Sequence, residues 1–353
     1  MFRLEFEEQI RPDAADTVRY FTDQHVALKV ISGDAPTTVA AVAAATGVPG
    51  TGSIEGGALP DDLEERADVA EETAVFGRVT PEQKRDLVRA FQARGHIVAM
   101  TGDGVNDVLA VKEADLGIAM GSGSGAAKAV SQLVLLDDRF ASLPHVVAEG
   151  RRVVANMERV ASLFLTKTVY ATFLAVVIGF VGLAFPFLPR HMTLIGSLTI
   201  GIPAFLLSFE PREIPIREGF LPRALAFALP AGLVSGIATF TLYGVSRIDT
   251  FDLALEQSRT AATTMMIVLG LIVLYEVIEP KEPHHYLMLA SLFAGYLFVL
   301  AVPPLRTLFD LTVPRWQAWL VIAAVSVVAG FIMKALIGWT QTSVGRRYGI
   351  DVS

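Results

Sequence analysis

The chain has 353 residues, of which 52% are hydrophobic and none is cysteine, and its mean hydropathy is +0.50. Soluble domains rarely average so high, which favours a membrane protein, and the lack of cysteine excludes disulfides, zinc–thiolate centres and a cysteine nucleophile. Residues 1–160 hold 25 acidic and 16 basic side chains, whereas residues 161–353 hold 11 and 13. We therefore expect an acidic domain in water followed by an apolar domain. An acidic balance also excludes nucleic acid as the expected partner.

The start of the chain has neither a secretory signal nor a transit peptide pattern. Short apolar runs alternate with helical patterns in the acidic part of the chain. VALKVIS (26–32) predicts a buried strand, and PTTVAAVAAATG (36–47) predicts a helix closed by a glycine. TAVFGRV (73–79) predicts a second strand, followed by a helix that opens at Pro81. Further strands are predicted within HIVAMTGDG (96–104), DLGIAM (115–120) and QLVLLDD (132–138), with a helix near Asn106. This alternation predicts a parallel α/β sheet, whose ligands gather at the carboxyl ends of the strands.

Polar residues follow two of these strands. Ser32-Gly33-Asp34 ends one strand, and Asp103, Asn106 and Asp107 follow another within TGDGVND. Two carboxylates four residues apart around a glycine turn, with an amide beside them, are suited to one hard cation such as Mg²⁺.

Lys84 lies on the helix after Thr80-Pro81 and would supply a fixed positive charge at the same edge of the sheet. A hydroxyl, a lysine and metal-binding carboxylates are the groups that stabilise negative charge in phosphoryl transfer. Taken singly, each has a plainer explanation: Asp103-Gly104 as a turn and Lys84 as an exposed helix lysine. GSGSG (121–125) is not a nucleotide-binding Walker loop, because no Gly-Lys-Ser/Thr follows it.

Six apolar stretches in the second half are long enough to cross a bilayer, which takes about 20 residues each. They run over 162–184, 192–209, 224–246, 260–278, 286–304 and 317–338. An even number places both termini on one side. Basic residues near the spans, among them Arg151, Arg152 and Arg159, favour the side of the acidic domain as cytoplasmic. We expect a multi-pass protein of the plasma membrane, surrounded by lipid, with both termini in the cytoplasm.

Two of the spans carry polar or helix-breaking residues that indicate a cation path. The first contains Lys167 and Thr168, and a mid-membrane lysine costs about 2.5–3.5 kcal/mol without a partner or water. Extension of Lys167 to the cytoplasmic interface is the alternative. The second contains Thr199 and Pro203, and the proline cannot donate to the carbonyl four residues earlier. Glu276 is the only deep acid further along, with an interfacial position as its alternative.

The ordered motifs resemble the phosphorylation domain of P-type cation ATPases, a member of the haloacid dehalogenase superfamily. The resemblance rests on ISGD (31–34), VTPEQK (79–84), MTGDGVNDVLAVKEADLGIAMGSGSGAAKA (100–129) and LVLLDDRF (133–140). RRVVANMERVASLFL (151–165) resembles the stalk entering the fifth membrane helix, and GIPAFLLSFEP (201–211) resembles the sixth. The fold class implied is an incomplete α/β phosphorylation domain followed by an all-helical domain of six membrane spans.

The resemblance assigns roles to the residues that match its motifs. It places Ser32, Gly33 and Asp34 at the phosphate-contacting motif, Lys84 beside the acyl phosphate, and Asp103 as the main Mg²⁺ ligand supported by Asn106 and Asp107. At the carboxylate positions of calcium pumps this sequence has Ala171 and Ile200, so Lys167, Thr168, Thr199, Pro203 and Glu276 remain as transport-site candidates.

The phosphorylated aspartate of the family lies in Asp-Lys-Thr-Gly-Thr, a string that this sequence does not contain. The nucleotide-binding and actuator domains and four membrane helices have no counterpart in it either. The resemblance implies part of an ATP-driven pump for a divalent cation such as calcium or magnesium, using Mg²⁺ and ATP and inactive without its N-terminal half as partner. The alternatives are a non-catalytic fragment, a regulatory partner of an intact pump, or a membrane-tethered phosphatase. The expected domains are a partial phosphorylation domain (1–143), a stalk helix (144–161), a membrane domain (162–340) and a cytoplasmic tail (341–353).

Overall fold

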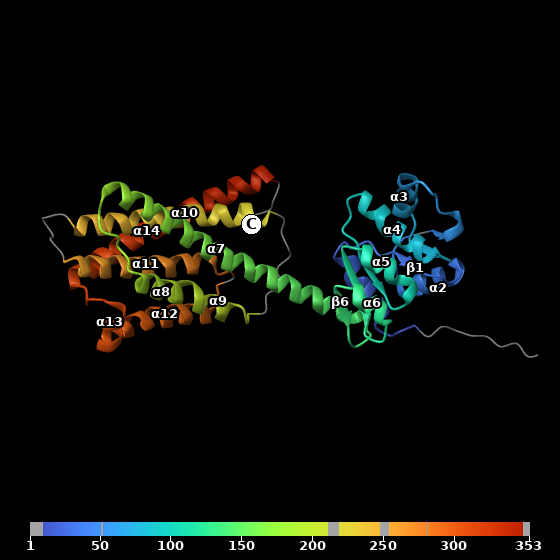
Figure 1. Cartoon of the computed structure of the whole chain (residues 1–353), viewed down its shortest axis with the longest axis horizontal. Helices are drawn as coiled ribbons and strands as arrows, with labels where there is room; N and C mark the ends of the chain where they lie inside the picture. The colour runs from blue at the N-terminus through green and yellow to red at the C-terminus, as the bar shows by residue number, and fades with distance from the viewer. Residues whose placement is uncertain (1–9, 51, 211–218, 248–253, 280, 349–353) are drawn as a thin grey trace, which may run out of the picture. The chain divides into compact units, whose positions relative to one another are not determined.

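The structure is a computed structural model that describes residues 10–50, 52–210, 219–247, 254–279 and 281–348. The beginning of the predicted domain 1–143 and the end of the predicted tail 341–353 lie outside the described residues. The chain divides into two compact units, Met1–Glu149 and Gly150–Ser353, which are coloured blue to green and green to red in Figure 1. The division falls inside helix α7 (Leu143–Val181), so the predicted stalk and the first span form one helix.

The first unit is a parallel α/β domain, as the sequence predicts. Within the residues that the structure describes, its strands form two three-stranded sheets of order β1-β3-β2 and β4-β5-β6, and all these pairings are parallel. The strands are β1 (Val30–Ile31), β2 (Ser53–Glu55), β3 (Val75–Gly77), β4 (Ala99–Gly102), β5 (Leu116–Met120) and β6 (Leu133–Leu135). The helices are α1 (Ala14–Asp23), α2 (Pro36–Thr46), α3 (Leu63–Glu72), α4 (Pro81–Ala93), α5 (Val108–Glu113) and α6 (Gly125–Val130). In the described part of the chain, β1 and β4 are each the edge of their sheet.

Local sequence signals fix the ends of two helices that matter for the site. Gly47 closes α2 at φ +80°, a left-handed conformation that glycine adopts without steric cost. Thr80 caps α4 through a hydrogen bond from the Gln83 N–H, and the Gln83 side chain accepts the Thr80 N–H in return. Pro81 occupies the first turn of α4, where its missing N–H costs nothing.

Helix α4 contributes to the cores of both sheets. Its Leu87 is fully buried and packs with Phe76 of β3, whereas Val88 packs with Ala110 of α5 and with Met100 of β4. Burying such side chains contributes about 1.5–3 kcal/mol each, so this shared helix fixes the two sheets relative to each other.

The second unit is a helical bundle, shown in Figure 1 as helices that run largely side by side. Beyond α7 it contains α8 (Pro189–Gly196), a π-helical turn (Ser197–Gly201), α9 (Ile202–Leu207), α10 (Phe220–Ser246), α11 (Leu255–Val277), α12 (Pro283–Ala301), α13 (Pro303–Phe309) and α14 (Trp316–Tyr348). Among the described residues, six helical segments are long and apolar enough to cross a membrane, with α8 to α9 counted as one. The six predicted spans are therefore confirmed by length and composition.

Close packing between α7 and α10 depends on two glycines four residues apart. A Cβ on Gly232 would lie 2.5 Å from Val169 Cβ, and one on Gly236 would lie 2.7 Å from Phe173 Cδ1. Small residues at this spacing let membrane helices approach closely.

Candidate functional site

The end of β1 forms a polar turn beside the start of α4. The Ser32 hydroxyl donates to Asp34 Oδ2 at 3.0 Å and accepts the Asp34 N–H at 3.1 Å. The backbone carbonyls of Ser32 and Asp34 accept the N–H groups of Val79 and Arg78, in the segment that enters α4. Gly33 and Asp34 are exposed, so this turn is accessible to a ligand.

The centre of the site is a buried ion pair that joins α4 to the end of β4. Lys84 Nζ lies 2.7 Å from Asp107 Oδ1, and both residues are only 8% exposed. Asp107 Oδ2 accepts the Gly104 N–H at 3.2 Å. A Cβ on Gly102 would lie 2.4 Å from Asp107 Cβ, so the glycine allows the Asp107 side chain to fold back over the strand end.

Asp103 and Asn106 present exposed side chains next to this pair in sequence. The Asp103 backbone is held by the loop Gly121–Gly125, because Ser124 N–H donates to the Asp103 carbonyl at 2.8 Å. A Cβ on Gly123 would lie 2.9 Å from the same oxygen. The loop that the sequence excludes as a Walker loop thus supports the backbone of a candidate metal ligand.

The donor set at this strand end fits Mg²⁺ by its chemistry. Asp103 offers an exposed carboxylate and Asn106 an exposed amide, and both are hard oxygen donors. Asp107 accepts hydrogen bonds on both oxygens, from Lys84 and from the Gly104 N–H, and adds a carboxylate beside these two donors.

In the membrane unit, Lys167 is directed toward the second span. A Cβ on Gly196 would lie 3.2 Å from Lys167 Nζ, which places the ammonium group against the end of α8. Gly196 is followed by the π-helical turn Ser197–Gly201, in which the backbone is wound more widely than in an α-helix. The predicted interruption at Pro203 is thus a π turn that keeps the chain helical, since proline has no N–H for the Thr199 carbonyl.

Thr199 lies on the inner side of the same turn. Its hydroxyl donates to the Ile195 carbonyl at 2.8 Å, and its Cγ2 would be 2.6 Å from a Cβ on Gly270 of α11. Lys167 therefore lies against the start of the π turn, Thr199 lies between that turn and α11, and Pro203 follows in α9.

The other two candidates lie apart from this group. Thr168 is exposed and donates to the Phe164 carbonyl on its own helix, because consecutive helical residues point about 100° apart. Glu276 is half-buried near the C-terminal end of α11, six residues and about 9 Å beyond Gly270 along the helix.

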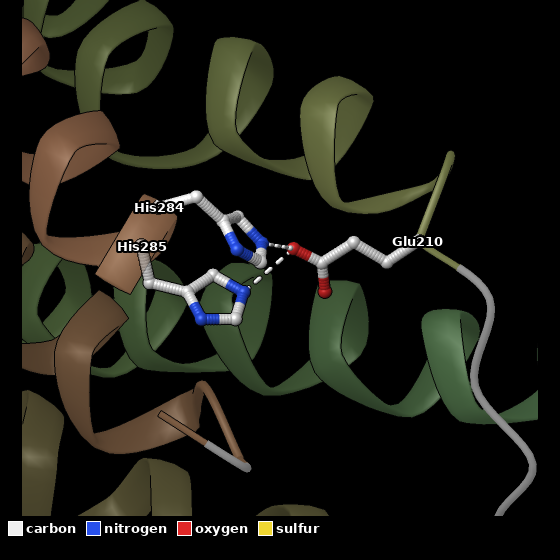
Figure 2. A group of neighbouring side chains, drawn as sticks. All are labelled: Glu210, His284 and His285. Carbon is white, nitrogen blue, oxygen red and sulfur yellow. Dashed lines mark hydrogen bonds and ion pairs between the residues drawn. The ribbon is translucent and has the colours of Figure 1, made fainter. Parts of the chain in front are cut away.

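Sequence reasoning missed a polar cluster at the end of α9. Figure 2 shows His284 and His285, both from α12, converging on the Glu210 carboxylate. The adjacent histidines after Pro283 were visible in the sequence, but their acidic partner is 74 and 75 residues away.

Comparisons with known proteins agree with both units. A family model for haloacid dehalogenase-like hydrolases matches residues 1–115. A calcium-transporting ATPase, CtpE, of Mycolicibacterium smegmatis is 45% identical over 350 residues, covering 96% of this chain and 44% of that protein. A probable cation-transporting ATPase, exp7, of Streptococcus pneumoniae is 35% identical over 88% of this chain and 40% of its own length. A calcium-transporting ATPase of Bacillus subtilis is 29% identical over 92% of this chain and 39% of its own length.

These findings define a haloacid dehalogenase-like α/β domain joined to a multi-pass membrane domain. The chain belongs to the P-type cation-transporting ATPase family, and the resemblance drawn from its motifs is confirmed. The chain spans less than half the length of the curated relatives it matches. Members of this family use Mg²⁺ and ATP.

Proposed function

We propose that this chain is part of an ATP-driven cation pump, in which hydrolysis of ATP through an aspartyl phosphate drives a divalent cation across the plasma membrane. The buried pair of Lys84 and Asp107 carries the proposal, because it holds a lysine beside the turn that contains Asp103, and the segment entering α4 is hydrogen-bonded to the turn Ser32–Asp34. Desolvation of the two charges costs free energy, and the need for a fixed positive charge beside a phosphate is a reason to keep such a pair.

The α/β unit would bind and orient a phosphoryl group. Lys84 would neutralise phosphate oxygens, and the turn Ser32–Asp34 would donate hydrogen bonds from its hydroxyl and backbone. Asp103, with Asn106 and Asp107, would hold Mg²⁺, which offsets the negative charge that spreads over the phosphate during transfer.

The nucleophile must come from outside these 353 residues, because they contain no Asp-Lys-Thr-Gly-Thr. We propose that the N-terminal half of a pump is the partner of this chain and that the chain alone is inactive. The edges of β1 and β4 support this proposal, since the site residues follow both of them and neither edge is hydrogen-bonded to another strand in the described residues.

The cation would pass along the π turn, which lies beside Lys167, contains Thr199 and is followed by Pro203. Pro203 has no N–H to donate to the Thr199 carbonyl, so this carbonyl would serve as an oxygen ligand for a cation. We propose calcium or magnesium as the cation, since the relative of highest identity quoted above is named a calcium-transporting ATPase. We place both termini in the cytoplasm, following the basic residues beside the spans.

The test uses a hybrid in which the N-terminal half of the M. smegmatis relative precedes this chain. The hybrid should take up acid-stable label from γ-labelled ATP with Mg²⁺, and this chain alone should take up none. Asp103→Asn should abolish the labelling, whereas Asp61→Asn, at an exposed position, should retain it. Equal labelling of the Asp103 variant would remove that residue from the site, and labelling of the isolated chain would overturn the missing-nucleophile proposal.

A second candidate is a non-catalytic membrane fragment or a regulatory partner of an intact pump, favoured by the same missing motif. Translation of the DNA upstream of Met1 separates the two. An open frame with Asp-Lys-Thr-Gly-Thr supports the pump, and a frame interrupted by stops supports the fragment. Ion-dependent ATP hydrolysis by the hybrid would then identify the cation.

A further inference from the structure

The polar cluster at the end of α9 brings together three separate parts of the membrane unit. His284 Nε2 lies 3.0 Å and His285 Nε2 lies 2.6 Å from Glu210 Oε1 (Figure 2). On the other carboxylate oxygen, a guanidinium nitrogen of Arg159 from α7 lies 3.3 Å from Glu210 Oε2. Arg159 also donates to the backbone carbonyl of Glu279, beyond the end of α11, at 3.2 Å.

Two histidines and a carboxylate, with ligand atoms within 4.8 Å of one another, have the composition of a transition-metal site. The hydrogen bond at the far side of the His285 ring argues against a metal. Glu282 N–H donates to His285 Nδ1 at 3.0 Å, so this nitrogen is unprotonated in the neutral ring and Nε2 carries the proton. A metal bound at Nε2 would need the lone pair that the proton occupies, and ligating histidines donate from their other nitrogen.

His284 has the same donor character for a different reason. Its Nδ1 lies 3.3 Å from Glu282 Oε2 and its Nε2 lies 3.0 Å from Glu210 Oε1. A carboxylate oxygen accepts hydrogen bonds and does not donate them, so the His284 ring donates to Glu210 from Nε2, and that nitrogen has no lone pair for a metal. Both histidines are therefore hydrogen-bond donors to Glu210.

Burial makes the Glu210 charge important. The Arg159 side chain is 6% exposed and that of His285 is also 6% exposed, whereas His284 is more than half exposed. Burial acts to raise the pKa of Glu210, but hydrogen bonds from His284 and His285 and the charge of Arg159 outweigh it and leave the pKa below its ordinary value. Glu210 is thus an anion that balances a buried arginine.

We propose that Glu210, Arg159, His284 and His285 form an ionic latch that holds the chain leaving α9 against α7 and α12, and that this cluster is not a metal centre. Its importance for transport rests on the proposed function. Helix α9 begins beside the π turn that contains Thr199, and α7 carries Lys167 about 12 Å along the helix from Arg159. The latch therefore positions the two helices of the proposed cation path relative to each other, and Glu210 is a positioning residue.

The first test uses the full chain in lipid nanodiscs and follows hydrogen exchange of the α9 amides. Glu210→Gln should raise their exchange rate about tenfold or more, because it leaves Arg159 buried without its counter-charge. Glu279→Gln is the matched control and should leave exchange unchanged, since this exposed residue contributes its carbonyl and not its carboxylate. His284→Gln alters a mostly exposed side chain and should give a smaller increase even if the Glu210 variant fails to fold. Unchanged α9 exchange in the His284 and Glu210 variants would overturn the latch.

The second test distinguishes the latch from a metal site by titration of the full chain with ZnCl₂ in a calorimeter. If the cluster is an ionic latch, we expect no stoichiometric binding of Zn²⁺. One Zn²⁺ bound per chain in the micromolar range, and lost in Glu210→Gln, would overturn the proposal.

The third test uses the hybrid pump to measure the positioning role. Glu210→Gln should raise the cation concentration that gives half-maximal ATP hydrolysis at least about threefold, since each tenfold change corresponds to 1.4 kcal/mol and only part of the pair's effect reaches the cation path. The ATP concentration for half-maximal activity should not change. Equal shifts for both ligands would contradict a positioning role, and a hybrid without any cation-dependent hydrolysis would refute the proposed function while leaving the exchange result to decide the latch.

Discussion

The buried pair of Lys84 and Asp107 allows a quantitative test of how the α/β unit is held together. Lys84→Met removes the positive charge and retains a long side chain with good helix propensity. Asp107 would then keep its carboxylate at 8% exposure, with the Gly104 N–H as its remaining hydrogen bond among those described.

The degree of burial of the ion pair sets the expected loss of stability in Lys84→Met. Exposed ion pairs contribute about 0–1 kcal/mol, whereas removing one member of a buried pair costs about 3–5 kcal/mol. The two side chains are 10% and 12% exposed, so the buried case applies. We expect Lys84→Met to lower the free energy of unfolding of the α/β unit by about 3 kcal/mol. This change corresponds to roughly a hundredfold faster hydrogen exchange of the most protected amides of α4 and β4.

Hydrogen exchange of the full chain in nanodiscs is the suitable assay. The three tryptophans lie at 316, 319 and 339, in the membrane unit, so tryptophan fluorescence does not report on the α/β unit. Lys112→Met, at an exposed lysine of α5, is the matched control and should change the free energy of unfolding by less than about 0.5 kcal/mol.

Addition of Mg²⁺ extends the test to the proposed metal site. In the Lys84 variant, Asp107 has an oxygen released from the lysine, so Mg²⁺ should restore part of the lost protection, and by more than it stabilises the unmodified chain. The double variant Lys84→Met/Asp107→Asn should show no such restoration. A loss of unfolding free energy below about 1 kcal/mol in Lys84→Met would refute the reasoning from burial. Equal Mg²⁺ effects in the unmodified chain, the single variant and the double variant would refute the assignment of Asp107 to the Mg²⁺ site.

Three further outcomes follow from the packing and charges described above. Gly232→Ala should destabilise the membrane unit by about 1–3 kcal/mol in thermal unfolding, because the new methyl group would overlap a valine of α7, whereas Gly244→Ala in the same helix meets nothing within 4 Å and should be neutral. Lys29→Met should destabilise α3 by about 2 kcal/mol, measured by hydrogen exchange, since the Lys29 ammonium donates to three backbone carbonyls at the end of that helix at 2.7–2.8 Å. Hydrogen bonds from the Val98 N–H and a glutamine side chain hold the pKa of Asp115 below its ordinary value. Its stabilising contribution is therefore present above that ordinary value and lost as the pH falls through the lowered pKa, so Asp115→Asn should make the unfolding midpoint of the first unit less sensitive to acid.

The fold could be predicted wherever the apolar pattern is long or repeated. The strands around residues 30, 75, 100, 118 and 134 and the six spans have such patterns, and the structure contains them all. Sequence reasoning missed β2, a strand of three residues with only Ile54 directed inward, because so short an element has no periodicity. It also missed α3, although Asp62 before Leu-Glu-Glu is a usable helix-start signal and its side chain accepts two N–H groups.

The sequence indicates which candidate residues follow the ends of strands. It does not indicate which side of a membrane helix a candidate residue faces. Lys84 follows β3 and Asp107 follows β4, strands of different sheets, and they meet because α4 packs against both sheets and carries the lysine to the turn after β4. In the membrane, Lys167 and Thr168 are adjacent in sequence but face different neighbours. The sequence does not show which side of a uniformly apolar helix faces its partners, so the two residues could not be separated in advance.

Each of the two buried ion pairs holds an acidic residue that follows a strand or a helix. Lys84 fixes an aspartate of the turn after β4, and Arg159 fixes a glutamate that follows the Pro203 helix. Hydrophobic residues of equal volume would stabilise such positions as well or better, since desolvation offsets most of the attraction within a buried pair. What a hydrophobic pair would not supply is direction, because apolar contacts tolerate sliding and rotation, whereas a charged pair with satisfied hydrogen bonds fixes the position of one backbone segment against another. Both pairs are therefore better explained by the need to position a neighbouring charged or polar site than by a contribution to overall stability.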